Sequence, residues 1–269
     1  MRAALISIAT LLMAACSTAP SNQQAVADLA PTGKLRAAIN VGNAVLAARP
    51  ATPGGEPTGI SVDLARELAR RLGVPLQLVV FDAAGKVVDA GKTGSWDIAF
   101  VALDPKRAAE IAQSPPYVQI EGSYLVKNDS PLKSNDEVDR KGHRVVVGLN
   151  SAYDLYLTRE LKQAQIVRTP TSGAVVDTML KENYEVSAGV KQALENDARR
   201  IPGVRLLPGR FMVINQAMAS QRVEGTRNVA GARYVREFIE EMKASGFVAK
   251  AIERHNQPSA VVAPPGDPK

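Results

Sequence analysis

One amphipathic segment, residues 59–75, constrains the fold of this chain more than any other. Leucines and alanines recur there at helical spacing on one side, while acidic and arginine side chains occupy the other side. Ser61 is a candidate N-cap, and a glycine and a proline follow the last turn. Short apolar runs at 35–39 and 76–81 flank the helix and predict strands. A strand, a helix and a second strand form a parallel crossover unit, so the segment predicts an α/β fold.

The rest of the chain alternates between predicted strands and predicted helices. Strands are expected at 96–102, 122–127, 144–149, 165–167, 185–189, 204–207 and 211–219. Helices are expected at 83–92, 152–163, 172–181, 191–200 and 229–244, with a short one that begins at 105 and ends at the prolines 115 and 116. In open parallel sheets, ligands bind beyond the carboxyl ends of the strands. The segments after Ile39 and Phe81 are therefore the first places to expect a site.

The N-terminus predicts an exported protein. Arg2 precedes an apolar run that ends at Ala15, which is too short to span a bilayer but typical of a signal-peptide core. Residues 1–15 are therefore predicted to be a signal peptide. The run 12–16 resembles a bacterial lipobox, and Cys16 would be the acylated residue. Ordinary signal-peptidase cleavage is the alternative. Lipidation would place the mature protein in the periplasm, anchored to a membrane.

Residue composition excludes several classes of function. The chain has 2 histidines and 1 cysteine, so it cannot form an intrachain disulfide, and a histidine-based triad or metal cluster is not expected. Lys and Arg exceed Asp and Glu, 33 against 27, but they do not cluster, and no nucleic-acid partner is expected. Phosphate-binding glycine patterns are also missing, so no nucleotide cofactor is expected. Binding of a small solute remains.

Several motifs resemble the family 3, or type II, periplasmic solute-binding proteins of ABC importers. The motifs are Lys34-Leu35-Arg36, residues 58–65, residues 96–99, Arg107 with Ser114-Pro115-Pro116-Tyr117, residues 146–149 and residues 238–246. Together they extend from about residue 34 to residue 255. The resemblance implies a small polar or carboxylate-bearing, amino acid-like solute, an ABC permease as partner, and a monomer that closes around the solute.

The same resemblance implies a two-lobed type II periplasmic binding protein fold. Each lobe is a mostly parallel sheet flanked by helices, and two hinge strands join the lobes. Lobe 1 is expected at 34–120 and 212–256, and lobe 2 at 121–211. Residues 16–33 are expected to form a tether, and the proline-rich residues 257–269 a disordered tail.

The resemblance also implies ligand contacts. Arg107 matches the arginine that holds an α-carboxylate of the ligand. Ser151 and Tyr153 stand in the turn that meets the same carboxylate from the other lobe. The further candidates are Asn43 and Leu46 after the first strand, Phe81, and Phe100 with Ala102, which replace small hydroxyl residues of the family.

One expected ligand contact is missing from the sequence. The family places an Asp, which binds the ligand's amino group, where this chain reads Ala188-Gly189-Val190-Lys191. Loss of such a charge-assisted hydrogen bond costs about 1.5–3 kcal/mol. Two explanations stay open: either Glu121 or Asp104 substitutes, or the ligand is not a standard α-amino acid. Lys191 would favour an additional anionic group on the ligand.

Two other classes of function remain as alternatives to transport. Cyclohexadienyl dehydratases resemble the same fold and need only carboxylate acid chemistry, so the scarcity of histidine does not exclude them. A ligand-sensing envelope protein without a transport role is the other alternative. No catalytic residue is assigned, and the chain is not expected to be an enzyme.

Overall fold

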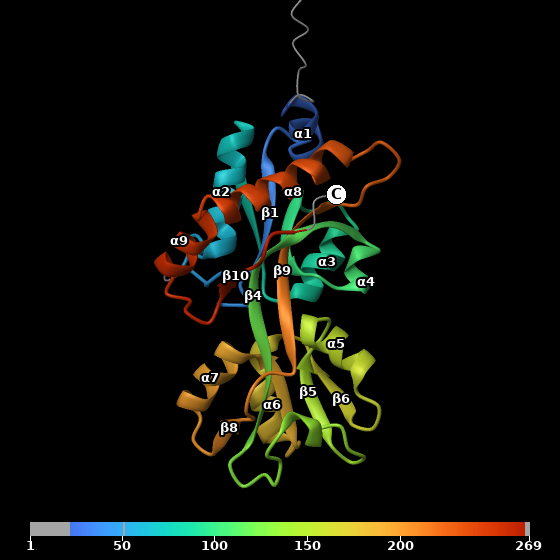
Figure 1. Cartoon of the computed structure of the whole chain (residues 1–269), viewed down its shortest axis with the longest axis vertical. Helices are drawn as coiled ribbons and strands as arrows, with labels where there is room; N and C mark the ends of the chain where they lie inside the picture. Colours follow the sequence, from blue (N-terminus) through green and yellow to red (C-terminus); the bar gives the residue numbers. More distant parts are fainter. Residues whose placement is uncertain (1–21, 51, 267–269) are drawn as a thin grey trace, which may run out of the picture.

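The computed structural model describes residues 22–50 and 52–266, which form an α/β fold with two lobes (Figure 1). The predicted signal peptide and Cys16 lie outside these residues. The helices are α1 (Asn22–Leu29), α2 (Ile60–Leu72), α3 (Ala84–Gly91), α4 (Pro105–Ala108), α5 (Ala152–Glu160), α6 (Val175–Lys181), α7 (Lys191–Arg200), α8 (Val229–Ala244) and α9 (Phe247–Arg254). The strands are β1 (Leu35–Asn40), β2 (Leu76–Phe81), β3 (Ile98–Ala102), β4 (Ile111–Lys127), β5 (Arg144–Gly148), β6 (Gln165–Thr169), β7 (Val186–Val190), β8 (Val204–Leu206), β9 (Met212–Gln221) and β10 (Val261–Val262).

The upper lobe of Figure 1 contains β1–β3 with α1–α4, α8 and α9. β1 pairs in parallel with β2 and β3, and α2 buries its leucines against this sheet. The predicted crossover unit is therefore confirmed. Gly59 is the N-cap instead of Ser61, and its φ of 137° favours glycine. A Cβ at Gly59 would lie 2.4 Å from the Leu46 carbonyl oxygen, so the close approach of this loop also requires glycine.

Two long antiparallel strands join the lobes. β4 has 17 residues and β9 has 10, and they pair with each other from Ile111↔Gln221 to Gly122↔Met212. The predicted lobe boundaries at 120/121 and 211/212 fall at that last pair. The prolines 115 and 116 do not end a helix; they lie inside β4, where the pairing register shifts, because proline is tolerated at bulges.

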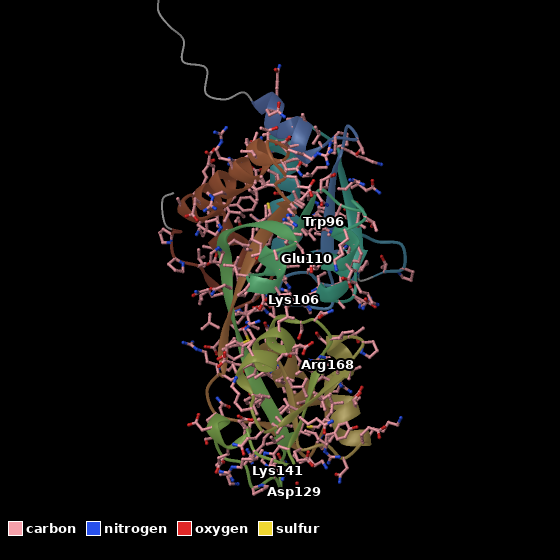
Figure 2. All side chains as sticks on the ribbon, turned by 90° about the vertical axis from the view of Figure 1, so that its right-hand side faces the viewer. Trp96, Lys106, Glu110, Asp129, Lys141 and Arg168 are labelled. Atoms are coloured by element: carbon pink, nitrogen blue, oxygen red, sulfur yellow. The ribbon has the colours of Figure 1, made fainter. Side chains whose placement is uncertain are left out.

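The lower lobe contains β5–β8 with α5–α7 (Figure 1). β5 pairs in parallel with β6 and β7, and β7 pairs antiparallel with β4, so one continuous sheet runs through both lobes in the order β2-β1-β3-β9-β4-β7-β5-β6. A separate apolar cluster around Val146, Met179 and Leu194 forms the core beneath α6 and α7. Figure 2 shows Trp96 in the upper lobe and Arg168 in the lower one.

The segments 22–33 and 257–266 are more ordered than the sequence indicated. α1 packs on α8 with Ala25 and Leu29 buried, and the Gly231 amide donates to Asp28 Oδ2 at 2.9 Å. β10 pairs with β4, and Ala260 and Ala263 are buried beside it. The predictions of a tether at 22–33 and of a disordered tail at 257–266 were therefore wrong, because the small apolar side chains in these segments are buried. Within the described residues, no helix combines the length and apolarity needed to cross a bilayer.

Glu67→Gln is expected to remove part of the acid sensitivity of the fold. Hydrogen bonds from Arg70 and Arg71 lower the pKa of Glu67 from 4.5 to about 2. A carboxylate with a lowered pKa stabilises the fold above the unfolded pKa, and the stabilisation disappears as pH falls from about 4.5 towards 2. The variant should lose up to about 1 kcal/mol of unfolding free energy at pH 7, a small amount because solvent screens surface pairs. It should lose less at pH 2, where Glu67 of the wild type is partly protonated. Urea titrations at both pH values measure this; an equal loss at pH 2 would contradict it.

Candidate functional site

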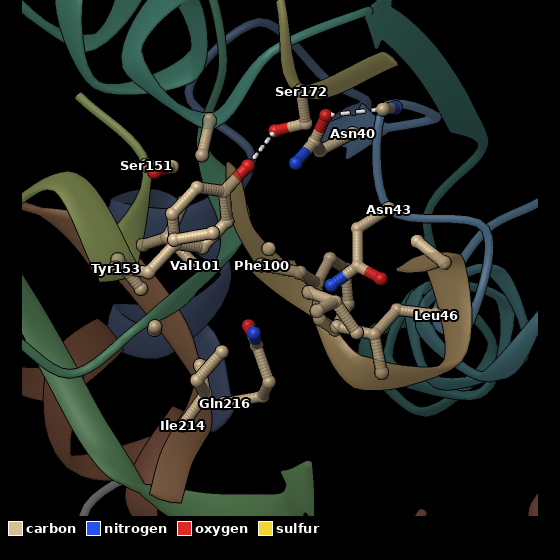
Figure 3. Close-up of a pocket in the computed structure, with 18 of the residues that line it drawn as sticks. Asn40, Asn43, Leu46, Phe100, Val101, Ser151, Tyr153, Ser172, Ile214 and Gln216 are labelled. Atoms are coloured by element: carbon tan, nitrogen blue, oxygen red, sulfur yellow. Dashed lines mark hydrogen bonds between the residues drawn. The ribbon is translucent and has the colours of Figure 1, made fainter. Parts of the chain in front are cut away.

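A small cavity lies between the lobes and has a volume of about 70 Å³ (Figure 3). It is bordered at the ends of β1, β3, β5 and β7, where parallel α/β sheets place their ligands. The upper lobe contributes Asn40, Asn43, Leu46, Phe100, Ala102 and Arg107; the lower lobe contributes Ser151, Tyr153, Ser172, Val190 and Asp197; β9 contributes Ile214 and Gln216. A site built from both lobes and a hinge strand can respond to their relative movement.

Arg107 is the one buried cation of the cavity wall among the described residues. It lies in α4, directly after β3, and is 2% exposed. Its guanidinium donates to the Ala102 carbonyl at 3.0 Å and to the Asn150 carbonyl of the lower lobe at 2.8 Å. No acidic side chain within the described ranges lies within salt-bridge distance of it. Burial therefore lowers the pKa of Arg107 from 12.5 to about 10, although the nearby Asp104 charge opposes the shift.

The N-terminus of α5 borders the cavity opposite Arg107. Ser151 caps this helix, because its Oγ accepts from the Asp154 amide at 3.0 Å. The first amides of a helix have no acceptor within the helix, so they favour an anion. Tyr153 is buried and its hydroxyl donates to Ser172 Oγ at 2.7 Å (Figure 3). Burial raises the pKa of Tyr153, so the phenol stays protonated and neutral.

Neutral amides complete the polar wall. Asn40, the last residue of β1, accepts from the Gly42 amide at 3.0 Å and so orders the turn that presents Asn43. Gln216 on β9 is 5% exposed, and its side-chain amide points into the cavity (Figure 3). It makes no side-chain hydrogen bond with any other described residue. The amide faces the cavity, so its donor and acceptor are available to a ligand.

The structure brings seven of the predicted contact residues to this cavity and places four elsewhere. Asn43, Phe100, Ala102, Arg107, Ser151 and Tyr153 line it, as does Leu46. Phe81 instead packs with Trp96 and Val87 in an apolar cluster of the upper lobe. It does so because its side chain points to the helix-covered face, where α3 and the buried Trp96 fill the space.

The three predicted charged contacts, Asp104, Glu121 and Lys191, do not line the cavity. Each of them forms an ion pair outside it. Asp104 caps α4 through the Lys106 amide and accepts from Arg159 at 2.9 Å. Glu121 accepts from Lys191 at 2.8 Å and from Arg210 at 2.6 Å, at the hinge. These two cations lower the pKa of Glu121, so it stays ionised, and Lys191 is not free for a ligand anion.

Among the wall residues that the sequence did not predict, five are polar: Asn40, Ser61, Ser172, Asp197 and Gln216. Asn40 and Gln216 carried a signal, since each is polar within a predicted strand or at its end. Asp197 lies two turns into α7, on the face of Ala193, and Ser172 starts the turn after β6. Their placement depends on how the lower lobe packs, which the local sequence does not reveal.

The lobes approach closely beside the cavity. Asp104 of the upper lobe bonds Arg159 of the lower lobe, and its carboxylate is buried. At a second contact between the lobes, a Cβ at Gly85 of α3 would lie only 2.7 Å from the Cβ of Asn150. The structure is therefore a closed arrangement in which glycine is needed where α3 meets the lower lobe.

Comparison with solved structures supports the same fold. A mutant of ArgBP from T. maritima has 19% identity and a TM-score of 0.71, with 86% of this chain and 99% of that chain covered. A putative ABC transporter binding component from Wolinella succinogenes, complexed with lysine, has 20% identity and a TM-score of 0.68, with 82% and 95% covered. An ancestral amino acid-binding protein, a precursor of cyclohexadienyl dehydratase, has 21% identity and a TM-score of 0.68, with 83% and 96% covered.

These likenesses confirm the predicted type II periplasmic binding protein fold. A search among curated proteins gave no match. The family model described as bacterial extracellular solute-binding proteins, family 3, matches residues 47–258. That match covers most of the chain and both lobes, and the resemblance noted from the sequence motifs falls in the same region. The chain therefore belongs to family 3 of the bacterial extracellular solute-binding proteins.

Proposed function

We propose that the protein is the extracytoplasmic receptor of an ABC importer and captures a small carboxylate-bearing solute between its lobes. The buried Arg107 guanidinium carries this proposal. An isolated buried cation is unfavourable, and a ligand carboxylate in the cavity would supply the missing counter-charge. The N-terminal amides of α5, on the facing wall, would bind the same carboxylate from the lower lobe. The lysine-bound relative supports an amino acid-like solute.

Closure follows from this division of contacts. A solute held by Arg107 on one lobe and by α5 on the other binds the closed arrangement better than an open one, and only such a preference shifts the equilibrium. The protein would act as a monomer that hands the solute to a permease of the inner membrane. The cavity wall offers Asp197 as its sole acid in the described residues, and Arg200 pairs with it. This arrangement favours binding over acid-catalysed dehydration.

Two experiments test this function. Mass spectrometry of the solute released from the purified protein should find a small carboxylate, and that compound should raise the Tm, because a ligand that binds only the folded state stabilises it. If a broad set of amino acids and organic acids all leave the Tm unchanged and nothing co-purifies, the proposal fails. Turnover of prephenate or arogenate would instead favour the enzyme alternative.

Membrane attachment through Cys16 belongs to the same proposal. The sequence before the described residues carries the lipobox-like run and the apolar core. Labelling of growing cells with a radioactive fatty acid should mark the wild-type protein. The Cys16→Ser variant should stay unlabelled; labelling of both proteins, or of neither, would exclude this anchor.

Asp104→Asn is expected to weaken solute affinity by up to about fivefold at low salt. The substitution keeps a good N-cap for α4 but removes the charge that binds Arg159 across the lobes, which stabilises closure. The effect is small because Arg159 is 45% exposed, and such pairs contribute about 1 kcal/mol or less. Calorimetric titrations at low and high salt measure it, and the difference from wild type should shrink at high salt. A loss that is equally large at both salt concentrations would contradict the electrostatic explanation.

A further inference from the structure

The two charged residues on the cavity wall, Arg107 and Asp197, differ in their pairing. Arg107 has no carboxylate partner in the described part of the chain, and burial depresses its pKa. Asp197, the acid on the wall, already accepts from Arg200 on the same helix at 2.9 Å. Among the described residues, Arg107 is therefore the charge on the wall that lacks an ion-pair partner, and a ligand with a single negative charge would supply one.

Within the described residues, the one carboxylate that lines the cavity is that of Asp197, and a ligand ammonium group would have to share it with Arg200. The segment Ala188-Gly189-Val190-Lys191, where the resemblance implies that contact, has no acid, and its Val190 is apolar and lines the cavity. The two acids that could have substituted are both engaged elsewhere. Glu121 is held by Lys191 and Arg210, and Asp104 is held by Arg159. A second positive charge beside Arg107 would therefore be unfavourable.

Gln216 is a second polar group on the cavity wall, on the hinge strand β9. In the sheet it stands directly beside Ala102 of β3, and the carbonyl of Ala102 accepts from Arg107 at 3.0 Å. Neighbouring residues in an antiparallel pair are about 4.5–5.5 Å apart. Gln216 and Arg107 thus both neighbour Ala102, and both line the same cavity.

The remaining polar groups of the wall are uncharged. Asn43 and the hydroxyls of Tyr153 and Ser172 supply neutral donors and acceptors, and Gln216 supplies both from one amide. The cavity of about 70 Å³ has room for a handful of water molecules, which limits the ligand to a few non-hydrogen atoms. Neutral amides suit a hydroxyl or oxo group, which needs no counter-ion.

We infer that the site prefers a small 2-hydroxy- or 2-oxocarboxylate over the matching α-amino acid, with Gln216 as the specificity-determining residue. The ligand carboxylate binds Arg107, and its uncharged 2-oxygen binds the Gln216 amide. This inference rests on the proposed function, because it assumes that the cavity holds a carboxylate. To the proposed function it adds the chemical class of the ligand's 2-substituent, which is an uncharged hydroxyl or oxo group.

The first test compares matched ligands on the unmodified protein. L-lactate and L-alanine differ only in a hydroxyl against an ammonium group, and glycolate and glycine form a second such pair. After dialysis to remove bound solute, calorimetry should show about tenfold or more tighter binding of the hydroxy acids, since an ammonium would lose a charge-assisted hydrogen bond. Pyruvate should bind as the hydroxy acids do. Preference for alanine and glycine would overturn the inference.

The second test reverses the preference. Gln216→Glu is nearly isosteric and adds a carboxylate beside the 2-substituent, so L-alanine should gain and L-lactate should lose about tenfold each. Gln119→Glu is the matched control: the Gln119 amide donates to Asn215 at 2.8 Å, on the opposite face of the sheet from the neighbouring Gln216. This control should keep the wild-type preference. If both variants change it equally, the inference is wrong, because added charge alone would explain the effect.

The outcomes separate this inference from the proposed function. If the wild type binds alanine best and Asp197→Asn abolishes that binding, Asp197 holds an ammonium group; the inference then fails while the solute-receptor function stands. If neither member of any pair binds and no other carboxylate does, both fail. The comparison on the wild-type protein decides even if Gln216→Glu does not fold, which a circular dichroism melt would reveal.

Discussion

Arg107→Ala is expected to weaken solute binding by about 30-fold to several thousand-fold. Truncating one partner of a buried, hydrogen-bonded charge pair costs about 2–5 kcal/mol, and every 1.4 kcal/mol is a factor of about ten. The ligand carboxylate would lose the guanidinium N–H groups that donate to it. The Asn150 carbonyl would lose its hydrogen bond from Arg107 of the upper lobe. The Ala102 carbonyl keeps a bond from Gln113 at 3.0 Å, so the local fold should persist.

Two further measurements separate charge from geometry at this position. Arg107→Lys keeps the charge but offers no planar fork, so its affinity should lie between those of the wild type and Arg107→Ala. Binding by the wild type should also weaken as pH rises towards about 10, where the free guanidinium loses its proton. Calorimetry with the co-purified solute measures both effects. Affinity that is unchanged in Arg107→Ala would remove Arg107 from the site.

The parts of the fold that local sequence predicts best are the periodic ones. α2 and its flanking strands follow from apolar spacing and end signals that act over a few residues. The prediction that a helix ends at the prolines 115 and 116 was wrong. A proline can end a helix, but it is also tolerated at a strand bulge. Which applies depends on the pairing of β4 with β9, which brings together residues about a hundred positions apart in the chain.

The site was predicted in part for the same reason. Arg107 and Ser151 stand at the ends of predicted strands and helices, and these ends converge in any parallel α/β lobe. Asp104 and Glu121 also stand near such ends, but long-range partners, Arg159 and Arg210, hold them outside the cavity. Charge pairing between residues far apart in the chain is a property of the folded protein, so a single sequence does not reveal it.

Gly85→Ala is expected to weaken solute binding about 5- to 150-fold while leaving the protein as stable as before or slightly more stable. The new Cβ would lie 2.7 Å from the Asn150 Cβ and 3.3 Å from the Leu149 carbonyl oxygen in the closed arrangement. Overpacking costs about 1–3 kcal/mol, which corresponds to this range of coupling factors. The lobes can relieve the contact by opening about the hinge strands, whereas alanine within α3 favours the helix over glycine. Solute affinity should therefore fall while the Tm of the ligand-free protein stays the same or rises slightly.

Asn150→Gly provides the matched rescue for this variant. It removes the Cβ that a side chain at Gly85 would strike, and the φ of 55° at Asn150 favours glycine. The backbone carbonyl that accepts from Arg107 stays in place. The double variant should recover most of the lost affinity, so the two substitutions should be strongly non-additive in a double-mutant cycle. Small-angle scattering should find Gly85→Ala more extended than the wild type when solute is present. If Gly85→Ala binds as tightly as the wild type, the close approach of α3 to the lower lobe is not part of the solute-bound state.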